Sequence, residues 1–117
     1  MKNMHMKKNE ISMLDVEQKE VSKMFTSQQE MDDFEDAVRA VLKEQKDRLN
    51  LTDEAVGKIA FSFMAGKRTK VQAIFVGQGA GQYRNKQKLR LPDMMNLAEA
   101  LGMTLPDVIK AALKRMP

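Results

Sequence analysis

The sequence predicts an all-α protein with five helices behind an N-terminal tail. From residue 31 onward, apolar residues recur at three- and four-residue steps. Serine or threonine precedes three of these apolar segments, and glycine follows three of them, as is typical of helix starts and ends. The chain has 117 residues, which is enough for one compact core. We therefore expect one domain over residues 26–117 and a flexible or marginally helical tail over residues 1–25.

Composition narrows the classes of protein and of function. The chain has no cysteine, so neither a disulfide framework nor a thiolate metal site is expected. Its apolar runs are short, and residues 1–8 lack the apolar stretch of a secretory signal, so we expect a cytoplasmic protein without membrane contact. No nucleophile is placed with a base, and no phosphate-binding glycine motif is complete. The sequence thus predicts no enzyme activity, no cofactor and no metal.

The N-terminal tail combines a weak helical stripe with many charged residues. Ile11, Leu14, Val21, Met24 and Phe25 fall roughly on one helical face. Three interpretations stay open for this segment: a marginal helix, a dimer contact, or a disordered segment that folds on a protein partner.

The first helix is expected to begin near Thr26 or Ser27. Ser27 and Glu30 have the spacing of a capping box. Acidic residues come early in the segment and basic residues late, which complements the helix dipole and explains the acids better than catalysis does. Its expected apolar face consists of Met31, Phe34, Ala37, Val38, Val41 and Leu42.

Two short helices are predicted next. The second should begin at Thr52 and end around residues 65–66. The third should run from about Thr69 to Val76, with Gly77 just after its end. The expected buried residues are Ala55, Val56, Ile59, Ala60 and Phe63 on the second helix, and Val71 and Ile74 on the third, with Phe75 left open.

A long loop and two further helices complete the prediction. Residues 78–90, the basic arm, are rich in glycine and then in basic residues, so we expect a mobile loop. Residues 91–93 open the fourth helix, which Gly102 stops, and Thr104 caps the fifth. The expected inward residues are Met94, Met95, Leu97, Ala98 and Leu101 on the fourth helix, and Leu105, Val108, Ile109, Ala112 and Leu113 on the fifth.

Charge is distributed very unevenly along the chain. Residues 55–92 contain eight basic residues and no acidic one, whereas residues 1–54 carry a net charge of −4 and residues 93–117 a net charge of zero. A surface of one sign attracts a polyanion, and attraction to phosphates is the usual first step in DNA binding. The alternative is a solvated loop that happens to be basic.

Three segments resemble the lambda-repressor/Cro-type helix-turn-helix family: residues 51–60 (LTDEAVGKIA), 70–77 (KVQAIFVG) and 97–109 (LAEALGMTLPDVI). The resemblance implies a five-helix lambda-repressor-like domain whose third helix enters the major groove, in a phage-repressor-like transcriptional regulator. It also implies binding to double-stranded DNA as a homodimer. Two departures stand out. Residues 62–68 carry about four residues more than the family's tight turn, and the basic arm is longer than the family's usual connection.

The resemblance and side-chain chemistry together suggest the contact residues. Glutamine can pair with adenine, arginine or lysine with guanine, and a methyl group can touch thymine. The expected base contacts are Arg68, Thr69, Lys70, Gln72 and Ala73. The expected phosphate contacts are Thr52, Lys58 and Lys67, with Arg84, Lys86, Lys88 and Arg90 from the basic arm.

The function predicted from the sequence is therefore that of a sequence-specific DNA-binding transcriptional regulator. One alternative is an antitoxin that binds a partner protein through residues 1–25 and controls its own expression through the helix-turn-helix. Another is an architectural nucleic-acid binder that depends on the basic arm alone.

Overall fold

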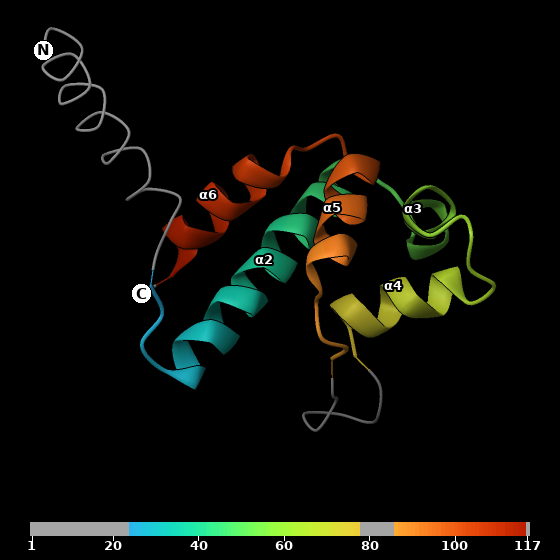
Figure 1. Cartoon of the computed structure of the whole chain (residues 1–117). Coiled ribbons are helices and arrows are strands. Elements are labelled where there is room, and N and C mark those ends of the chain that lie inside the picture. The colour runs from blue at the N-terminus through green and yellow to red at the C-terminus, as the bar shows by residue number, and fades with distance from the viewer. Residues whose placement is uncertain (1–23, 78–85, 117) are drawn as a thin grey trace, which may run out of the picture.

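The computed structural model describes residues 24–77 and 86–116, and these residues form five α-helices and no strand. The prediction of an all-α fold with five helices is confirmed. The tail lies outside the described residues except for Met24 and Phe25. The helices are α2 (Gln28–Arg48), α3 (Asp53–Ala60), α4 (Lys67–Phe75), α5 (Leu91–Ala100) and α6 (Leu105–Arg115), as Figure 1 shows.

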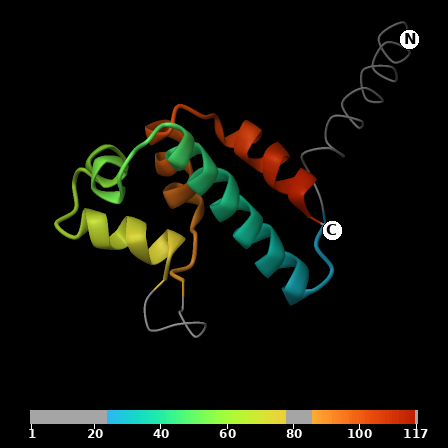
Figure 2. The same ribbon diagram turned by 180° about the vertical axis from the view of Figure 1, so that it is seen from behind.

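Helix α2 is the longest of the described helices, and α6 packs along it (Figures 1 and 2). The Ser27 hydroxyl accepts a hydrogen bond from the Glu30 amide at 3.1 Å, as the capping-box spacing predicted. The Glu30 carboxylate, however, accepts from the amide of Thr26 at 2.8 Å rather than from that of Ser27. Val38 and Leu42 are fully buried in the core.

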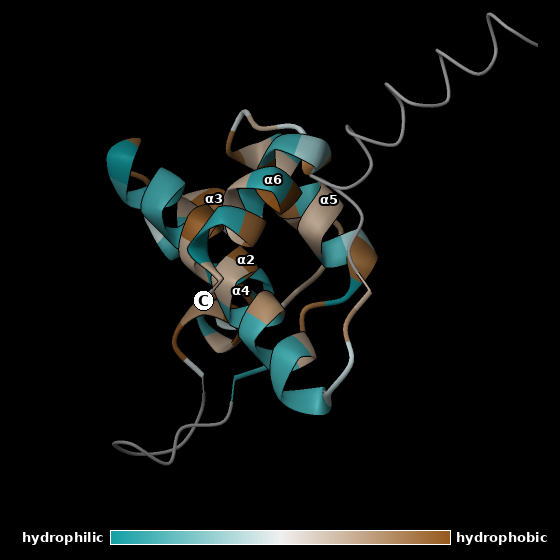
Figure 3. Ribbon diagram, turned by 90° about the vertical axis from the view of Figure 1, so that its left-hand side faces the viewer, coloured by the Kyte–Doolittle hydropathy of each residue, from teal (hydrophilic) through white to brown (hydrophobic). Residues whose placement is uncertain are grey.

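The first turns of α2 extend beyond the core. Figure 3 shows hydrophilic residues along this end of the helix. Met31 was expected on the apolar face but is 46% exposed, so that assignment is wrong. The reason is positional, because the helices that cover α2 pack against its later turns, where the buried residues Ala37, Val38, Val41 and Leu42 lie.

Helix α3 is shorter than the sequence predicted. Thr52 caps it, since its hydroxyl accepts from the Ala55 amide at 3.1 Å, but the helix ends at Ala60 and not near residues 65–66. Phe61 then leaves the helical conformation (φ −131°, ψ 41°) and is 1% exposed. The change of direction sends Phe61 into the core. Ile59 and Phe63, both expected to be buried, are 59% and 78% exposed.

Helices α3 and α4 pack closely at Gly57. A Cβ atom added at Gly57 would lie 3.0 Å from both the carbonyl carbon and the carbonyl oxygen of Lys67. Helix α4 begins two residues earlier than predicted, at Lys67, and Gly77 follows it with a φ of 89°, as expected for a C′ glycine. Residues 61–66 form the turn between the two helices.

Helices α5 and α6 follow the predicted pattern at most positions. Gly102 ends α5 with a φ of 71°, and the Thr104 hydroxyl accepts from the Asp107 amide at 3.3 Å to cap α6. Leu97, Ala98 and Leu101 are buried as expected, but Met95 is 53% exposed because it lies on the opposite side of α5. In the described part of the chain, no helix is long and apolar enough to cross a membrane.

The contact at Gly57 leads to a stability prediction. Gly57→Ala should lower the free energy of unfolding by about 1–3 kcal/mol, because the added methyl group would press on the backbone of Lys67. This loss should exceed the gain of about 1 kcal/mol that alanine normally brings to a helix interior. Urea unfolding followed by circular dichroism measures the difference. Gly66→Ala is the control, since nothing lies within 4 Å of the Cβ position there. A Gly57→Ala protein as stable as the wild type would contradict this account.

Candidate nucleic-acid interface

Helix α4 has one buried face and one exposed face. Val71, Ile74 and Phe75 are buried in the core. Phe75, which the sequence left unassigned, is therefore a core residue. Arg68, Thr69 and Gln72 are exposed. Because residues four apart lie on one side of a helix, Arg68 and Gln72 share a face, and Thr69 lies beside them. These three are the expected base contacts that α4 presents to solvent.

The start of α4 favours an anion. The N-cap residue of α4 is Gly66, so no side chain accepts hydrogen bonds from the first amides of this helix. The first turn also contains no acidic residue. Unpaired amides at a helix N-terminus carry a partial positive charge. Lys67 and Arg68 add their own charges at the same end, and no ion pair engages either of them among the described residues. The positive potential of this turn is therefore directed toward solvent.

Two of the expected base contacts instead serve the interior. The Lys70 ammonium lies 3.4 Å from a carboxylate oxygen of Asp93 and 5.1 Å from the centre of the Phe61 ring, and its side chain is 15% exposed. Ala73 is 6% exposed. Lys70 therefore joins α4 to α5, and Ala73 packs inside the protein. Arg68, Thr69 and Gln72 are therefore the expected base contacts whose side chains α4 exposes, whereas the side chains of Lys70 and Ala73 are mostly buried.

The expected phosphate contacts on α3 and α4 lie at the surface. Lys58 is exposed and 3.9 Å from Glu54, one turn earlier on α3. Lys67 is half-buried beside Gly57. Thr52 is exposed, although its hydroxyl already caps α3. Lys58 and Lys67 thus retain accessible charge, whereas Thr52 would contact a phosphate through an oxygen that is already in use.

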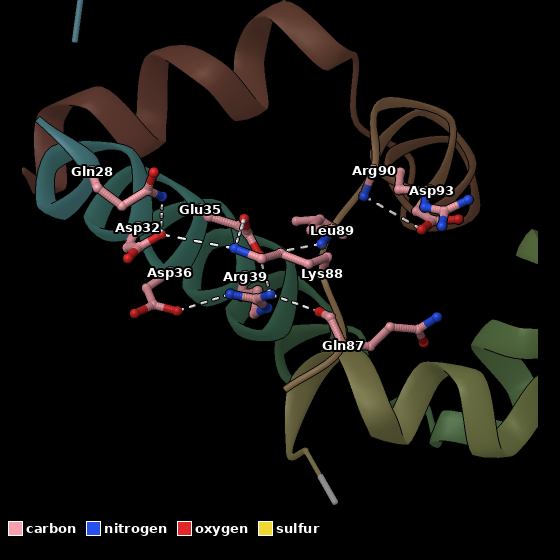
Figure 4. Close-up of polar contacts among 10 residues, drawn as sticks. All are labelled: Gln28, Asp32, Glu35, Asp36, Arg39, Gln87, Lys88, Leu89, Arg90 and Asp93. Atoms are coloured by element: carbon pink, nitrogen blue, oxygen red, sulfur yellow. Dashed lines mark hydrogen bonds and ion pairs between the residues drawn. The ribbon is translucent and has the colours of Figure 1, made fainter. Parts of the chain in front are cut away.

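The last part of the basic arm is held in place, which corrects the expectation of a loop that is mobile throughout. The Gln87 amide donates to the carbonyl of Ala73 at 2.9 Å, and the Gln87 carbonyl accepts from Arg39 Nη2 at 2.7 Å. The Leu89 amide donates to the Glu35 carboxylate at 3.2 Å, and the Leu89 side chain is 8% exposed. Figure 4 shows these contacts between α2 and residues 87–89.

Arg39 is the centre of this network and was missed by the sequence reasoning. It is 7% exposed and pairs with Glu35 and with Asp36, the latter at 2.8 Å. Its only sequence signal was its position three and four residues after these acids, which is also common on solvated helix faces. The acids of α2 complement the helix dipole, and Glu35 in addition accepts a hydrogen bond from the Leu89 amide of the basic arm.

The basic side chains of residues 86–90 point outward from this anchored backbone. Lys86, Lys88 and Arg90 are exposed, while Leu89 is buried between the last two. The Lys88 ammonium lies 3.8 Å from Asp32 and 3.9 Å from Glu35, so part of its charge is offset within the chain. Arg84 lies outside the described residues.

A surface groove of about 610 Å³ runs beside α4, between the α3–α4 turn and residues 86–87. It is lined by Met64, Gly66, Thr69, Lys70, Ala73, Lys86 and Gln87. The groove brings the exposed face of α4 and the anchored end of the basic arm to a common edge. No acidic side chain lines it within the described part of the chain. Among the described residues that line the groove, the two with ionisable side chains are Lys70 and Lys86.

Comparison with known proteins identifies no relative of this chain. No protein-family model matches the chain, and no curated protein or solved structure matches it either. Among the described residues there is also no cluster of acidic or histidine side chains that could hold a metal ion. The functional argument therefore rests on this chain's own surface.

The buried arginine gives a second stability prediction. Arg39→Ala should lower the free energy of unfolding by about 2–3 kcal/mol, because the Gln87 carbonyl loses a charged donor and Glu35 loses its main partner. Arg115→Ala is the matched control, since Arg115 also pairs with a glutamate of α2 but is 39% exposed. That change should cost less than about 1 kcal/mol. Urea unfolding of both variants tests the difference, and equal losses would show that burial at Arg39 is unimportant.

Proposed function

We propose that this protein is a sequence-specific double-stranded DNA-binding regulator of transcription that reads bases with the exposed face of α4. One observation carries the proposal: a short helix presents Arg68, Thr69 and Gln72 on one face, and its first turn contains no acid. Arginine and glutamine are the side chains that pair best with guanine and adenine edges in the major groove. The close packing at Gly57 and the Lys70–Asp93 pair fix the helix that carries them.

The basic groups around α4 support the same proposal. Lys67 is the first residue of α4, Lys58 lies on α3 next to Gly57 where the two helices meet, and Lys86 lines the groove beside α4. Contacts to phosphates position a protein on the duplex, while base contacts give it sequence preference. A protein that used the basic arm alone would bind without preference, so specificity is the property to measure.

The direct experiment is selection of bound sequences from a random duplex pool. The proposal predicts enrichment of a short motif, and binding to it that exceeds binding to a scrambled duplex at physiological salt. Equal affinity for all duplexes would support the architectural alternative. No binding to any duplex at low salt would exclude both.

Base reading by α4 is tested at Gln72. Gln72→Ala should weaken binding to the preferred site by about 1–3 kcal/mol and relax the preference at one base pair, while nonspecific binding changes little. Gln29→Ala is the control, because Gln29 is also exposed but lies on the first turn of α2, where its side-chain amide donates to Asp33. Affinities come from titration of labelled duplexes. A uniform loss on all sequences would show that Gln72 is not a base contact.

The basic arm is tested through salt dependence. Changing Lys86 and Lys88 together to glutamine should reduce the slope of log K against log salt by up to about 2, with sequence preference retained. Lys88 should contribute less than Lys86, since Asp32 and Glu35 already lie near it. Lys110→Gln with Lys114→Gln on α6 is a control of equal charge change at exposed positions. An unchanged slope in the arm variant would place the arm away from the phosphates.

A further inference from the structure

The backbone of the basic arm is bound on two sides at Gln87. The Gln87 amide donates to the carbonyl of Ala73 at 2.9 Å, and the Gln87 carbonyl accepts from Arg39 Nη2 at 2.7 Å. Two residues later, the Leu89 amide donates to the Glu35 carboxylate at 3.2 Å. We call these three hydrogen bonds the arm anchor. Because both backbone polar groups of Gln87 are engaged, the anchor fixes the chain where it passes the groove beside α4.

Lys86 takes its position from the arm anchor, since it directly precedes Gln87. Both residues line the groove, and the lining also includes Thr69 of α4. Lys86 is exposed, and no ion pair engages its ammonium among the described residues. The Lys88 ammonium, in contrast, lies 3.8 Å from Asp32. Within the described part of the arm, Lys86 is therefore the basic residue that lies at the groove with its charge unpaired.

Arg39 is too enclosed to bind a ligand itself. It is 7% exposed, and its guanidinium group pairs with Glu35 and Asp36 and donates to the Gln87 carbonyl. Figure 4 shows Arg39 reaching from α2 toward Gln87. Apolar residues of similar volume often replace a buried ion pair without loss of stability, but an apolar side chain cannot donate to a carbonyl. Any influence of Arg39 on a ligand must pass through the segment that it holds.

Holding the arm in advance favours binding. A lysine on a free loop has to be ordered when it contacts a phosphate, and the lost conformational freedom opposes association. The arm anchor removes the backbone part of this cost, because residues 87–89 are already held in the folded protein. A cation that is placed in advance therefore raises affinity for a phosphate without any added contact.

We infer that Arg39 is a positioning residue for DNA binding: through the arm anchor it holds Lys86 at the groove, where Lys86 contacts the phosphate backbone of the strand beside α4. The inference rests on the proposed function and adds a residue of α2 to it. Because Arg39 acts through a phosphate contact, it should raise affinity for every duplex alike. Sequence preference should not depend on it, since α4 is also held by its close packing on α3 and by its ion pair to α5.

A double-mutant cycle tests this mechanism, with dissociation constants from titration of labelled duplexes. Arg39→Met removes the donors and keeps an unbranched apolar side chain. It should weaken binding to the preferred and the scrambled duplex by the same factor, about threefold to tenfold. In a Lys86→Gln background the same change should weaken binding less than about twofold, because the contact that Arg39 positions is already absent. In a Lys58→Gln background, which lacks a cation of α3 instead, the full factor should remain.

Arg115→Met is the matched control, since Arg115 also pairs with a glutamate of α2 but lies on α6; it should leave affinity unchanged. Stoichiometric titration gives the binding-competent fraction of each variant, so that partial unfolding is not counted as weak binding. Amide hydrogen exchange supplies a readout without DNA, because exchange at Gln87 and Leu89 should become faster in Arg39→Met and not in Arg115→Met. If Arg39→Met does not fold, Leu89→Ala replaces it in the cycle, because it removes the buried side chain that holds the same segment.

Each outcome of the cycle decides one question. Equal losses from Arg39→Met in the wild-type and Lys86→Gln backgrounds, or no loss at all, would overturn the inference and leave the proposed function intact. A loss confined to the preferred duplex would also overturn it, since Arg39 would then act on α4 and not on the arm. Wild-type protein that binds no duplex at low salt would exclude the proposed function, and the inference with it.

Discussion

The ion pair between Arg39 and Glu35 holds together parts of the chain that are far apart in sequence. Both residues lie on α2, yet they bind the backbone of Gln87 and Leu89, about fifty positions later. The Gln87 amide in turn binds the end of α4 through Ala73. Removing water from an arginine is costly unless its donors find partners, and the Gln87 carbonyl supplies one to Arg39 Nη2, while the buried Nε has none among the described residues. The network thus couples α2, the proposed recognition helix α4 and residues 87–89 of the basic arm.

Helix α4 is fixed from two further directions. On one side Gly57 allows α3 to approach the Lys67 backbone so closely that a side chain would not fit. On the other, Lys70 pairs with the nearly buried Asp93 at the start of α5 and lies over the ring of Phe61. Rigid placement matters for base reading, because hydrogen bonds to base edges tolerate little error in distance or angle. The helix has only nine residues, and its position comes from these neighbours rather than from its own length.

The sequence by itself determined the helices, because their signals are local. Ser27, Thr52 and Thr104 cap helices as predicted, since a hydroxyl needs only the amide of a residue three positions on. Gly77 and Gly102 follow helix ends because few other residues adopt a positive φ. The apolar steps also placed most of the core, including Val38, Leu42, Val71 and Leu97.

Only the tertiary structure decided which side chains are left at the surface. Periodicity could not show that α3 ends at Ala60, which buries Phe61 and exposes Phe63. It could not show that Lys70 pairs with Asp93 on another helix, or that Arg39 binds a segment nearly fifty residues away. Burial and ion pairing depend on which elements pack together, and the spacing of residues along one helix does not contain that information. For this reason the spacing of residues could not separate the exposed Arg68, Thr69 and Gln72 from the mostly buried Lys70 and Ala73. It also could not show that residues 87–89 are anchored on α2.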